Sequence, residues 1–187
     1  MAKLIYTVIA SLDGYVEDAD GGLVWAAPDD EVLAFICELE RPIGTYLYGR
    51  RMYQTMAVWE TMTGAEQGPL TGEFAGIWQG AEKIVYSRTL TEPASARTRI
   101  AGEFDPSAVA RLKQSAPTDL SIGGAELAGQ ALAAGLVDEL RLFLCPILVG
   151  GGKRFLPEGV HTRVELLGER PFRNGVTYLR YRLSPAG

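Results

Sequence analysis

The sequence predicts an α/β protein in which helices flank a mixed, largely parallel β-sheet with antiparallel strands at one side. Strand-like apolar segments alternate with helical patterns over about the first two thirds of the chain, which is typical of parallel strands joined by crossover helices. From residue 139 onward, strand patterns follow one another without a convincing helix between them. The dipeptide Asn174-Gly175 splits the last of these runs, as a hairpin turn does.

Length and composition are those of an ordinary globular protein. With 187 residues, 47% of them apolar, we expect residues 1–187 to form one domain with a sizeable core. The net charge of -5 provides no sequence-wide basic field, so nucleic acid and anionic membranes are poor candidates for partners. No apolar run is long enough to cross a bilayer, and we expect a cytoplasmic protein. Cys37 and Cys145 lie within apolar patterns and are predicted to be buried thiols.

The first element is a buried strand over residues 3–10, which Ser11-Leu12-Asp13-Gly14 ends as a turn. Residues 18–22 form a polar loop of the kind that folds over a site, although a plain surface loop has the same composition. A helix begins at Pro28, because proline suits the first helical turn and the carboxylates that follow suit the positive end of the helix dipole. Its apolar side chains recur at helical spacing as far as Leu39.

The middle of the chain repeats the order of strand, turn and helix. Short β-branched runs indicate the strands, and apolar residues three or four positions apart indicate the helices. The predicted elements here are a strand over 45–48, a helix after 49–53, a loop over 60–71, a short helix that buries Phe74, Ile77 and Trp78, strands over 82–86 and 98–101, and a helix that Asp105 caps.

The stretch from Asp119 to Leu127 runs from a short apolar strand through Gly123-Gly124 directly into a helix. Glycine lets a backbone approach a ligand closely, and the N–H groups at the start of a helix favour an anion. A phosphate site is one interpretation, and an ordinary tight turn is the other. The helix ends near Gly135, and strands over 139–149 and 163–167 follow.

Three turns fall at the carboxyl ends of predicted parallel strands: Gly49-Arg50-Arg51, Ser87-Arg88 and Gly123-Gly124. Open α/β sheets bind ligands at this edge. A diphosphate held by the two glycines, with the guanidinium groups of Arg50 and Arg88 to either side, describes a dinucleotide with an additional 2′-phosphate, so we predict NADPH as the cofactor. Each arginine by itself would more commonly be a solvated surface residue, and their shared placement favours the cofactor.

Asp30 is the best candidate for proton handling. A carboxylate in the first turn of a helix, next to Trp25, can be partly buried and hold a polar ring by paired hydrogen bonds. Alternatively, Asp30 only complements the helix dipole. Asp13 likewise is either a proton-handling group or an ordinary turn aspartate.

Other motifs carry less information. The single histidine, His161, has no companion at metal-ligand spacing, so neither a metal site nor Ser-His-Asp chemistry is predicted. Gly150-Gly151-Gly152-Lys153 is similar to a phosphate-binding P-loop, but Arg154 stands where Ser or Thr is required. We interpret this segment as a loop between strands.

Five segments together carry a family resemblance. They are Ala10-Ser11-Leu12-Asp13-Gly14, Tyr48-Gly49-Arg50-Arg51-Met52-Tyr53, Tyr86-Ser87-Arg88, Ser121-Ile122-Gly123-Gly124-Ala125-Glu126-Leu127, and Pro146-Ile147-Leu148-Val149-Gly150-Gly151-Gly152-Lys153-Arg154-Phe155. In their order and spacing the chain resembles the superfamily of dihydrofolate reductase and of the C-terminal reductase domain of the riboflavin-biosynthesis deaminase-reductase, specifically its small stand-alone members. The resemblance implies a dihydrofolate reductase-like three-layer fold, NADPH as hydride donor, and a heterocyclic substrate in the adjoining cleft.

The resemblance also implies roles for individual residues. The implied cofactor contacts are Ala10 at the nicotinamide, the Gly49-Arg50-Arg51 turn at the phosphates, Ser87 and Arg88 at the 2′-phosphate, and Gly123, Gly124, Ala125, Glu126 and Leu127 at the diphosphate. The segment from Trp25 to Asp30 resembles the dihydrofolate reductase substrate segment, which places Asp30 in the position of the pterin-binding carboxylate.

The leading hypothesis is an NADPH-dependent reductase that transfers hydride to a pyrimidine or pteridine-like compound, resembling 5-amino-6-(5-phosphoribosylamino)uracil reductase. One alternative is dihydrofolate reductase-type activity on a reduced folate or pterin, and another is a non-catalytic nucleotide-binding module. The apolar strand over 140–149 and the last hairpin also favour a homodimer, because such strands at one side of a sheet tend to be paired or covered.

Overall fold

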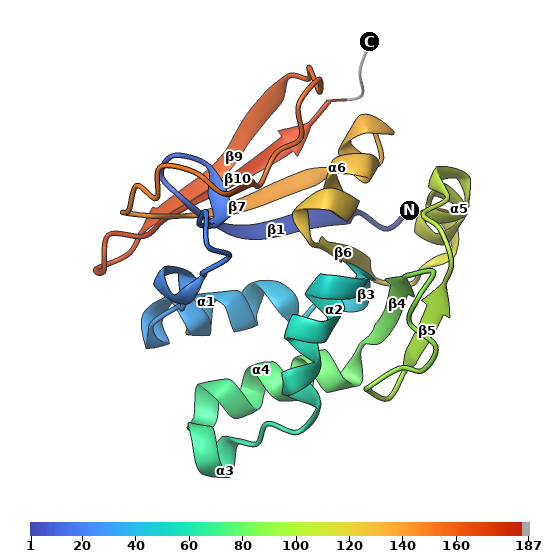
Figure 1. The fold of residues 1–187 in the computed structure, drawn as a ribbon, viewed down its shortest axis with the longest axis horizontal. Coiled ribbons are helices and arrows are strands. Elements are labelled where there is room, and N and C mark those ends of the chain that lie inside the picture. The colour runs from blue at the N-terminus through green and yellow to red at the C-terminus, as the bar shows by residue number, and fades with distance from the viewer. Residues whose placement is uncertain (185–187) are drawn as a thin grey trace.

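The computed structural model describes residues 1–184, except for the side chains of residues 66 and 67. Its strands are β1 (Leu4–Ser11), β2 (Tyr15–Glu17), β3 (Ile43–Gly49), β4 (Glu82–Tyr86), β5 (Thr98–Ala101), β6 (Asp119–Gly123), β7 (Glu139–Cys145), β8 (Lys153–Arg154), β9 (Val164–Pro171) and β10 (Thr177–Leu183). Eight of them form one sheet in the order β5-β4-β3-β6-β1-β7-β10-β9 (Figure 1). The short strands β2 and β8 pair with each other in a second sheet.

The large sheet is mixed, as predicted. β1 pairs in parallel with β6 and β7, β3 pairs in parallel with β6 and β4, and β4 pairs in parallel with β5. β10 runs antiparallel to both β7 and β9. The predicted hairpin at Asn174-Gly175 connects β9 to β10, and the Asn174 side chain accepts a hydrogen bond from the Val176 N–H across that turn. The carboxyl ends of the parallel strands therefore share one edge of the sheet.

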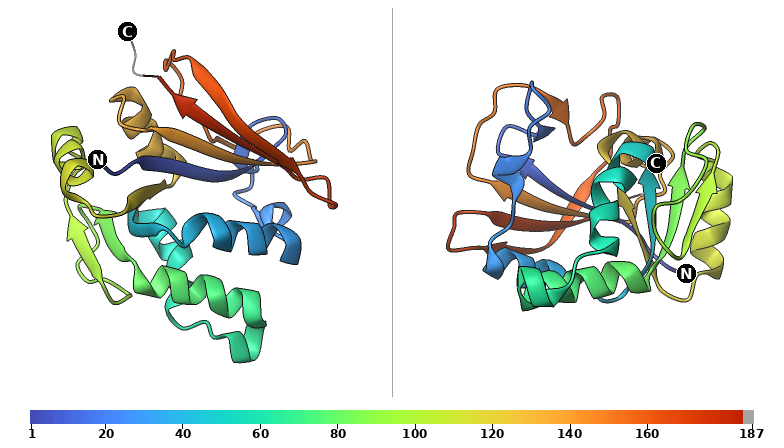
Figure 2. Two further views of the ribbon diagram at one scale, coloured as in Figure 1. Left: turned by 180° about the vertical axis from the view of Figure 1, so that it is seen from behind. Right: turned by 60° about the horizontal axis from the view of Figure 1, so that its bottom comes forward.

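Helices cover both faces of this sheet and make three layers. The α-helices are α1 (Asp30–Glu40), α2 (Arg50–Met56), α3 (Gly64–Gln67), α4 (Pro69–Gly80), α5 (Pro106–Ser115) and α6 (Ala125–Ala133). Two short 3-10 helices, η1 (Val24–Ala26) and η2 (Ala57–Glu60), lie between them. On one face, α1 and α4 contribute Val32 and Trp78 to a core cluster that includes Ile5 of β1. Figure 2 shows these two helices on the same side of the sheet. On the other face, α5 and α6 cover Leu4 and Leu120. This is a dihydrofolate reductase-like fold.

The prediction of a loop over residues 60–71 was wrong in part, because this segment contains α3 and the first turn of α4. Glycines and polar residues in this segment resemble loop composition. In the structure, two of those glycines let α3 and α4 touch. A Cβ added to Gly72 would lie 2.5 Å from the Cα of Gly64, which no larger residue tolerates.

Two strand boundaries also differ from the predictions. The strand expected over 139–149 ends at Cys145, because Pro146 has no N–H to donate to a neighbouring strand. The strand expected over 163–167 instead covers Val164–Pro171.

Both cysteines are buried free thiols, as predicted, and burial raises their pKa. Among residues 1–184, no helix has the length and apolar character that crossing a membrane requires.

β9 forms one outer edge of the large sheet. Val164 and Leu166 on this strand remain 50% and 49% exposed. Strand edges with exposed apolar residues tend to be paired or covered. Self-association along this side of the sheet therefore stays a prediction.

A buried carboxylate ties the middle of the sheet to its antiparallel side. Glu139 on β7 is 3% exposed and accepts hydrogen bonds from Lys3 Nζ at 2.6 Å and from Arg180 Nε and Nη2 at 2.8 and 2.9 Å. Burial alone would raise the pKa of Glu139, but the hydrogen bonds and charges of Arg180 and Lys3 outweigh burial and lower it to about 2. The folded state therefore holds the ionised form.

We expect Glu139→Gln to lower the free energy of unfolding by about 3 kcal/mol at pH 7. The folded-state pKa of Glu139 lies below its ordinary value of 4.5, so its stabilisation is present above pH 4.5 and is lost as the pH falls through about 2. Urea denaturation between pH 2 and pH 8 measures both effects. Glu165→Gln is the control, because Glu165 pairs with Arg182 at an exposed position and its loss should change stability by less than about 1 kcal/mol.

Candidate functional site

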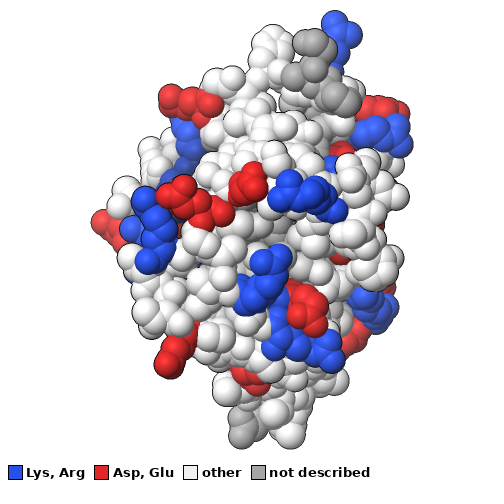
Figure 3. Space-filling model, turned by 90° about the vertical axis from the view of Figure 1, so that its right-hand side faces the viewer, with Lys and Arg blue, Asp and Glu red and all other residues white. Residues whose placement is uncertain are grey.

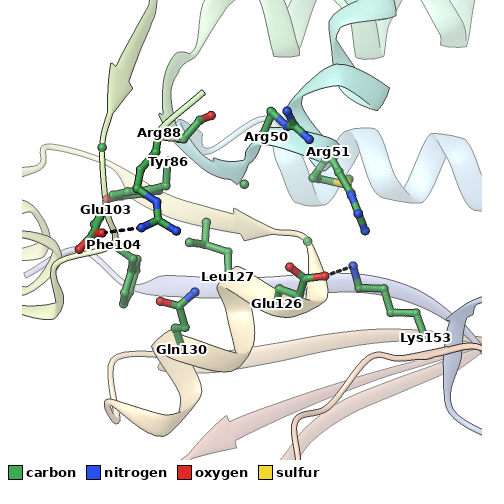
Figure 4. A pocket seen from close by; sticks show the side chains of 15 residues that line it. Arg50, Arg51, Tyr86, Arg88, Glu103, Phe104, Glu126, Leu127, Gln130 and Lys153 are labelled. Carbon is green, nitrogen blue, oxygen red and sulfur yellow. Dashed lines mark hydrogen bonds and ion pairs between the residues drawn. The ribbon is translucent and has the colours of Figure 1, made fainter. Parts of the chain in front are cut away.

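The carboxyl ends of three neighbouring strands bring the sequence-predicted turns together. Gly49-Arg50-Arg51 follows β3, Ser87-Arg88 follows β4, and Gly124 follows β6. Residues of all three turns line one open cavity of about 520 Å³, which we call the edge cavity (Figure 4). Glu126 and Leu127 of α6 line it as well, together with Phe104 and Gln130.

The junction of β6 and α6 has the form of a cradle for an anion. Gly123 pairs with Tyr48 of β3 in the sheet, and a Cβ on Gly123 would lie 2.7 Å from the Tyr48 ring, so only glycine leaves room for the ring in this position. Gly124 has a φ of +94°, a conformation that L side chains rarely adopt. It also has no side chain with which to cap the first turn of α6. The N–H groups at the start of this helix therefore keep their capacity to bind an anion.

Cationic side chains surround the edge cavity. Arg50 Nη1 donates a hydrogen bond to Thr89 Oγ1 at 3.1 Å, and Arg88 Nη1 lies 3.3 Å from Glu103 Oε1. Arg88 and Glu103 are 79% and 76% exposed, so water screens their pair and Arg88 is free to exchange Glu103 for another anion. On the face drawn in Figure 3, basic and acidic side chains are interspersed, and no broad basic patch is seen there.

A second, mostly apolar cavity adjoins the edge cavity. It has a volume of about 320 Å³, and we call it the inner chamber. Its walls come mainly from β1, α1, β3, α2 and β6, with Leu23 and Ala26 from the segment before α1 that contains η1. Four residues line both cavities: Arg51, Met52, Gly124 and Lys153. An elongated ligand can therefore lie in both at once.

Lys153 is a site residue that the sequence analysis missed. Its Nζ lies 2.7 Å from Glu126 Oε1, across the boundary between the two cavities (Figure 4). The hydrogen bond from Lys153 lowers the pKa of Glu126. In the sequence, Lys153 belongs to a segment interpreted only as a loop between strands. The available signal was a cation directly after three glycines, but its distance in the chain from the other turns concealed the contact.

Asp30 and Ala10 lie outside both cavities. Asp30 is the first residue of α1 and is exposed, while Asp29 before it caps the helix by accepting a hydrogen bond from the Val32 N–H at 3.0 Å. Ala10 is fully buried near the carboxyl end of β1, within the core that α6 covers. The structure therefore does not bring these two residues to the walls of either cavity.

Trp25 and Asp13 have different surroundings. Trp25 lines a third cavity, of about 230 Å³, which shares Ile9, Ala26 and Phe143 with the inner chamber. Its buried indole Nε1 has no hydrogen-bond partner among the described residues. Asp13 accepts hydrogen bonds from the Val149 N–H at 3.2 Å and the Gly150 N–H at 2.7 Å. A hydrogen bond with Ser11, together with these backbone contacts, lowers the pKa of Asp13. Asp13 thus connects the turn after β1 to the segment that contains Val149 and Gly150.

Comparison with known proteins identifies the family. The model of the RibD C-terminal domain matches residues 2–178. The chain belongs to the RibD C-terminal domain family. This confirms the resemblance inferred from the five sequence segments. The chain is also similar to the uncharacterized protein YyaP of Bacillus subtilis (strain 168). The two are 29% identical over 182 residues, which cover 96% of this chain and 94% of YyaP.

Solved structures share the fold. A protein from Shewanella sp. PV-4, provisionally assigned to riboflavin biosynthesis, has a TM-score of 0.76 at 21% identity and covers 98% of this chain and 99% of its own. A pyrimidine reductase-like protein from Corynebacterium diphtheriae has a TM-score of 0.74 at 16% identity, over 99% and 93% of the two chains. The Thermotoga maritima diaminohydroxyphosphoribosylaminopyrimidine deaminase/5-amino-6-(5-phosphoribosylamino)uracil reductase has a TM-score of 0.68 at 14% identity, over 98% of this chain and 57% of that longer enzyme.

We expect Gly123→Ala to lower the free energy of unfolding by about 1–3 kcal/mol, because the added Cβ must displace the buried Tyr48 ring. Urea denaturation measures the change. Gly76→Ala in α4 is the control, since its Cβ would meet no atom within 4 Å and the substitution should be neutral or stabilise the helix by up to about 1 kcal/mol. Equal stability of the two variants would contradict the close approach at the start of α6.

Proposed function

We propose that this protein is an NADPH-dependent oxidoreductase that transfers hydride to a pyrimidine or pteridine-like substrate. One observation carries the proposal: a cationic edge cavity at the carboxyl ends of parallel strands opens into a mostly apolar chamber through shared lining residues. Phosphates suit the first environment and flat rings suit the second. A dinucleotide cofactor that meets a heterocycle requires this combination.

The residues of the edge cavity fit a 2′-phosphorylated dinucleotide. The start of α6, with glycines where a side chain would clash, would hold the diphosphate. Arg50 and Arg88 reach the same cavity from two different turns, and guanidinium groups bind phosphate oxygens in a fork. When bound, the cofactor supplies the hydride. The protein provides orientation and excludes water.

The inner chamber fits the heterocycle. Its volume of about 320 Å³ is at the lower end of the range for small-molecule sites, which suits one ring system. Tyr46 and Thr7 are among the polar groups on its mostly apolar walls. Membership of the RibD C-terminal domain family supports a substrate of the uracil type, because the Thermotoga maritima relative is named as a 5-amino-6-(5-phosphoribosylamino)uracil reductase.

The test of this function is NADPH oxidation, followed at 340 nm, with 5-amino-6-(5-phosphoribosylamino)uracil and with 7,8-dihydrofolate. We expect turnover with the uracil. Turnover with dihydrofolate alone would assign the protein to folate or pterin reduction instead. NADPH binding in calorimetry without turnover of either compound would favour a non-catalytic nucleotide-binding module.

Substitution of the arginines tests the cofactor. We expect Arg50→Ala and Arg88→Ala each to raise the Kd for NADPH about tenfold while changing the Kd for NADH less than about threefold, because only NADPH carries the 2′-phosphate. Isothermal titration calorimetry with both cofactors measures the difference. Arg111→Ala is the control, as Arg111 on α5 lines neither cavity and pairs with exposed Asp105. Equal losses for the two cofactors would contradict the assignment of the 2′-phosphate.

A further inference from the structure

Glu40, the last residue of α1, is a buried acid on the wall of the inner chamber. It is 4% exposed. Its Oε1 accepts a hydrogen bond from Thr7 Oγ1 at 3.3 Å, and its Oε2 accepts one from Tyr46 Oη at 3.0 Å. All three residues line the chamber. α1, β1 and β3 thus contribute one polar cluster to a cavity that is otherwise mostly apolar.

The surroundings of Glu40 disfavour a negative charge. The carboxyl group lies at the C-terminal end of a helix, where the helix dipole repels an anion. The nearest guanidinium, that of Arg141, donates from Nη1 to the Leu39 carbonyl at 3.0 Å, and its Nη2 lies 3.9 Å from Glu139. Burial raises the pKa of Glu40, and the hydrogen bond from Tyr46 and the charge of Arg141 offset this only in part.

The other titratable groups around Glu40 keep their protons at ordinary pH. Tyr46 and Tyr48 face it from β3, and Tyr178 faces it from β10. Burial raises the pKa of all three phenols. Burial likewise raises the pKa of Glu40, and the charge of Arg141, from β7, opposes this effect only in part, so the Glu40 carboxyl group keeps its proton to a higher pH than an ordinary glutamate does.

We propose that Glu40 contacts the polar edge of the substrate ring and is the proton donor of the reduction. This inference rests on the proposed function and adds the residue that completes its chemistry. The chamber has room for one ring system, so a polar group on its wall reaches a bound heterocycle. Asp30 is exposed and lines neither cavity, which leaves Glu40 as the better-placed carboxyl group of α1.

The step balances with the groups named. Hydride from the dihydronicotinamide of NADPH adds to the carbon of a C=N or C=O bond of the substrate, and a new C–H bond forms. The π electron pair of that bond moves to nitrogen or oxygen, which takes the proton from the Glu40 carboxyl group. NADPH is oxidised to NADP⁺, the substrate is reduced by two electrons, and Glu40 is left as a carboxylate that regains its proton from water. General acids of this kind accelerate reactions about 10²–10⁴-fold.

Glu40→Gln tests the proposal, because glutamine keeps the size and hydrogen-bonding capacity of the acid but cannot transfer its proton. With 5-amino-6-(5-phosphoribosylamino)uracil and NADPH, we expect kcat to fall about 100-fold. The Kd for NADPH should stay within about twofold of the wild-type value. The wild-type kcat should decline as the pH rises through the pKa of Glu40, since the proton is then lost, and the variant should lack this decline.

Glu38→Gln is the matched control, because it makes the same chemical change at an exposed position two residues earlier on α1. It should retain the wild-type kcat and pH profile. A melting temperature of Glu40→Gln within about 3 °C of the wild type at pH 6 separates lost chemistry from lost structure.

Two results would overturn the proposal while the reductase function stands: wild-type kcat in Glu40→Gln, or the same alkaline decline in wild type and variant. Removal of that decline by Asp30→Asn instead would return the role to Asp30. Absence of NADPH oxidation by the wild-type protein, with both the uracil and 7,8-dihydrofolate, would reject the proposed function itself and the role of Glu40 with it.

Discussion

The packing of the Tyr48 ring of β3 against Gly123 of β6 is the constraint on which the site depends. Gly123 lies against the ring of Tyr48, where a Cβ would clash. Tyr48 in turn accepts a hydrogen bond from Trp78 Nε1 at 3.3 Å and stacks on Tyr46, with ring centroids 5.5 Å apart. Tyr46 donates its hydrogen bond to Glu40. One continuous set of contacts therefore joins the anion cradle at the start of α6 to the polar cluster on the chamber wall.

This arrangement separates two electrostatic environments over a short path. In the edge cavity, the arginines are exposed, so water screens their interactions with partners such as Glu103. In the inner chamber, burial favours uncharged forms, as the raised pKa values of Glu40 and Tyr46 show. Lys153 and Arg51 stand at the boundary between the two. The cationic environment and the mostly apolar environment thus occupy two separate, adjoining cavities.

Local patterns predicted the strands of the large sheet, the main helices and the cationic turns correctly in kind, because each depends on neighbours in sequence, whereas they did not predict β2 and β8. The Gly123-Gly124 junction is an example, since an apolar strand, two glycines and a helical pattern follow directly upon one another. The prediction of a loop over residues 60–71 failed because the helices there depend on a contact between residues apart in sequence. Gly64 and Gly72 are typical of loops, and only their mutual contact explains why they occur in helices.

The sequence by itself determined the mixed sheet, its antiparallel end, the family and the turns of the edge cavity, because periodicity and short motifs encode these features locally. The choice among the acids of α1 was decided only by the tertiary structure. Asp30 and Glu40 lie on the same helix, and nothing in their immediate neighbours shows that β1 and β3 enclose the second while the first faces water. The same holds for Lys153, whose contact with Glu126 spans 27 residues. Burial and long-range contact are properties of packed elements, and a chain acquires them only when those elements meet.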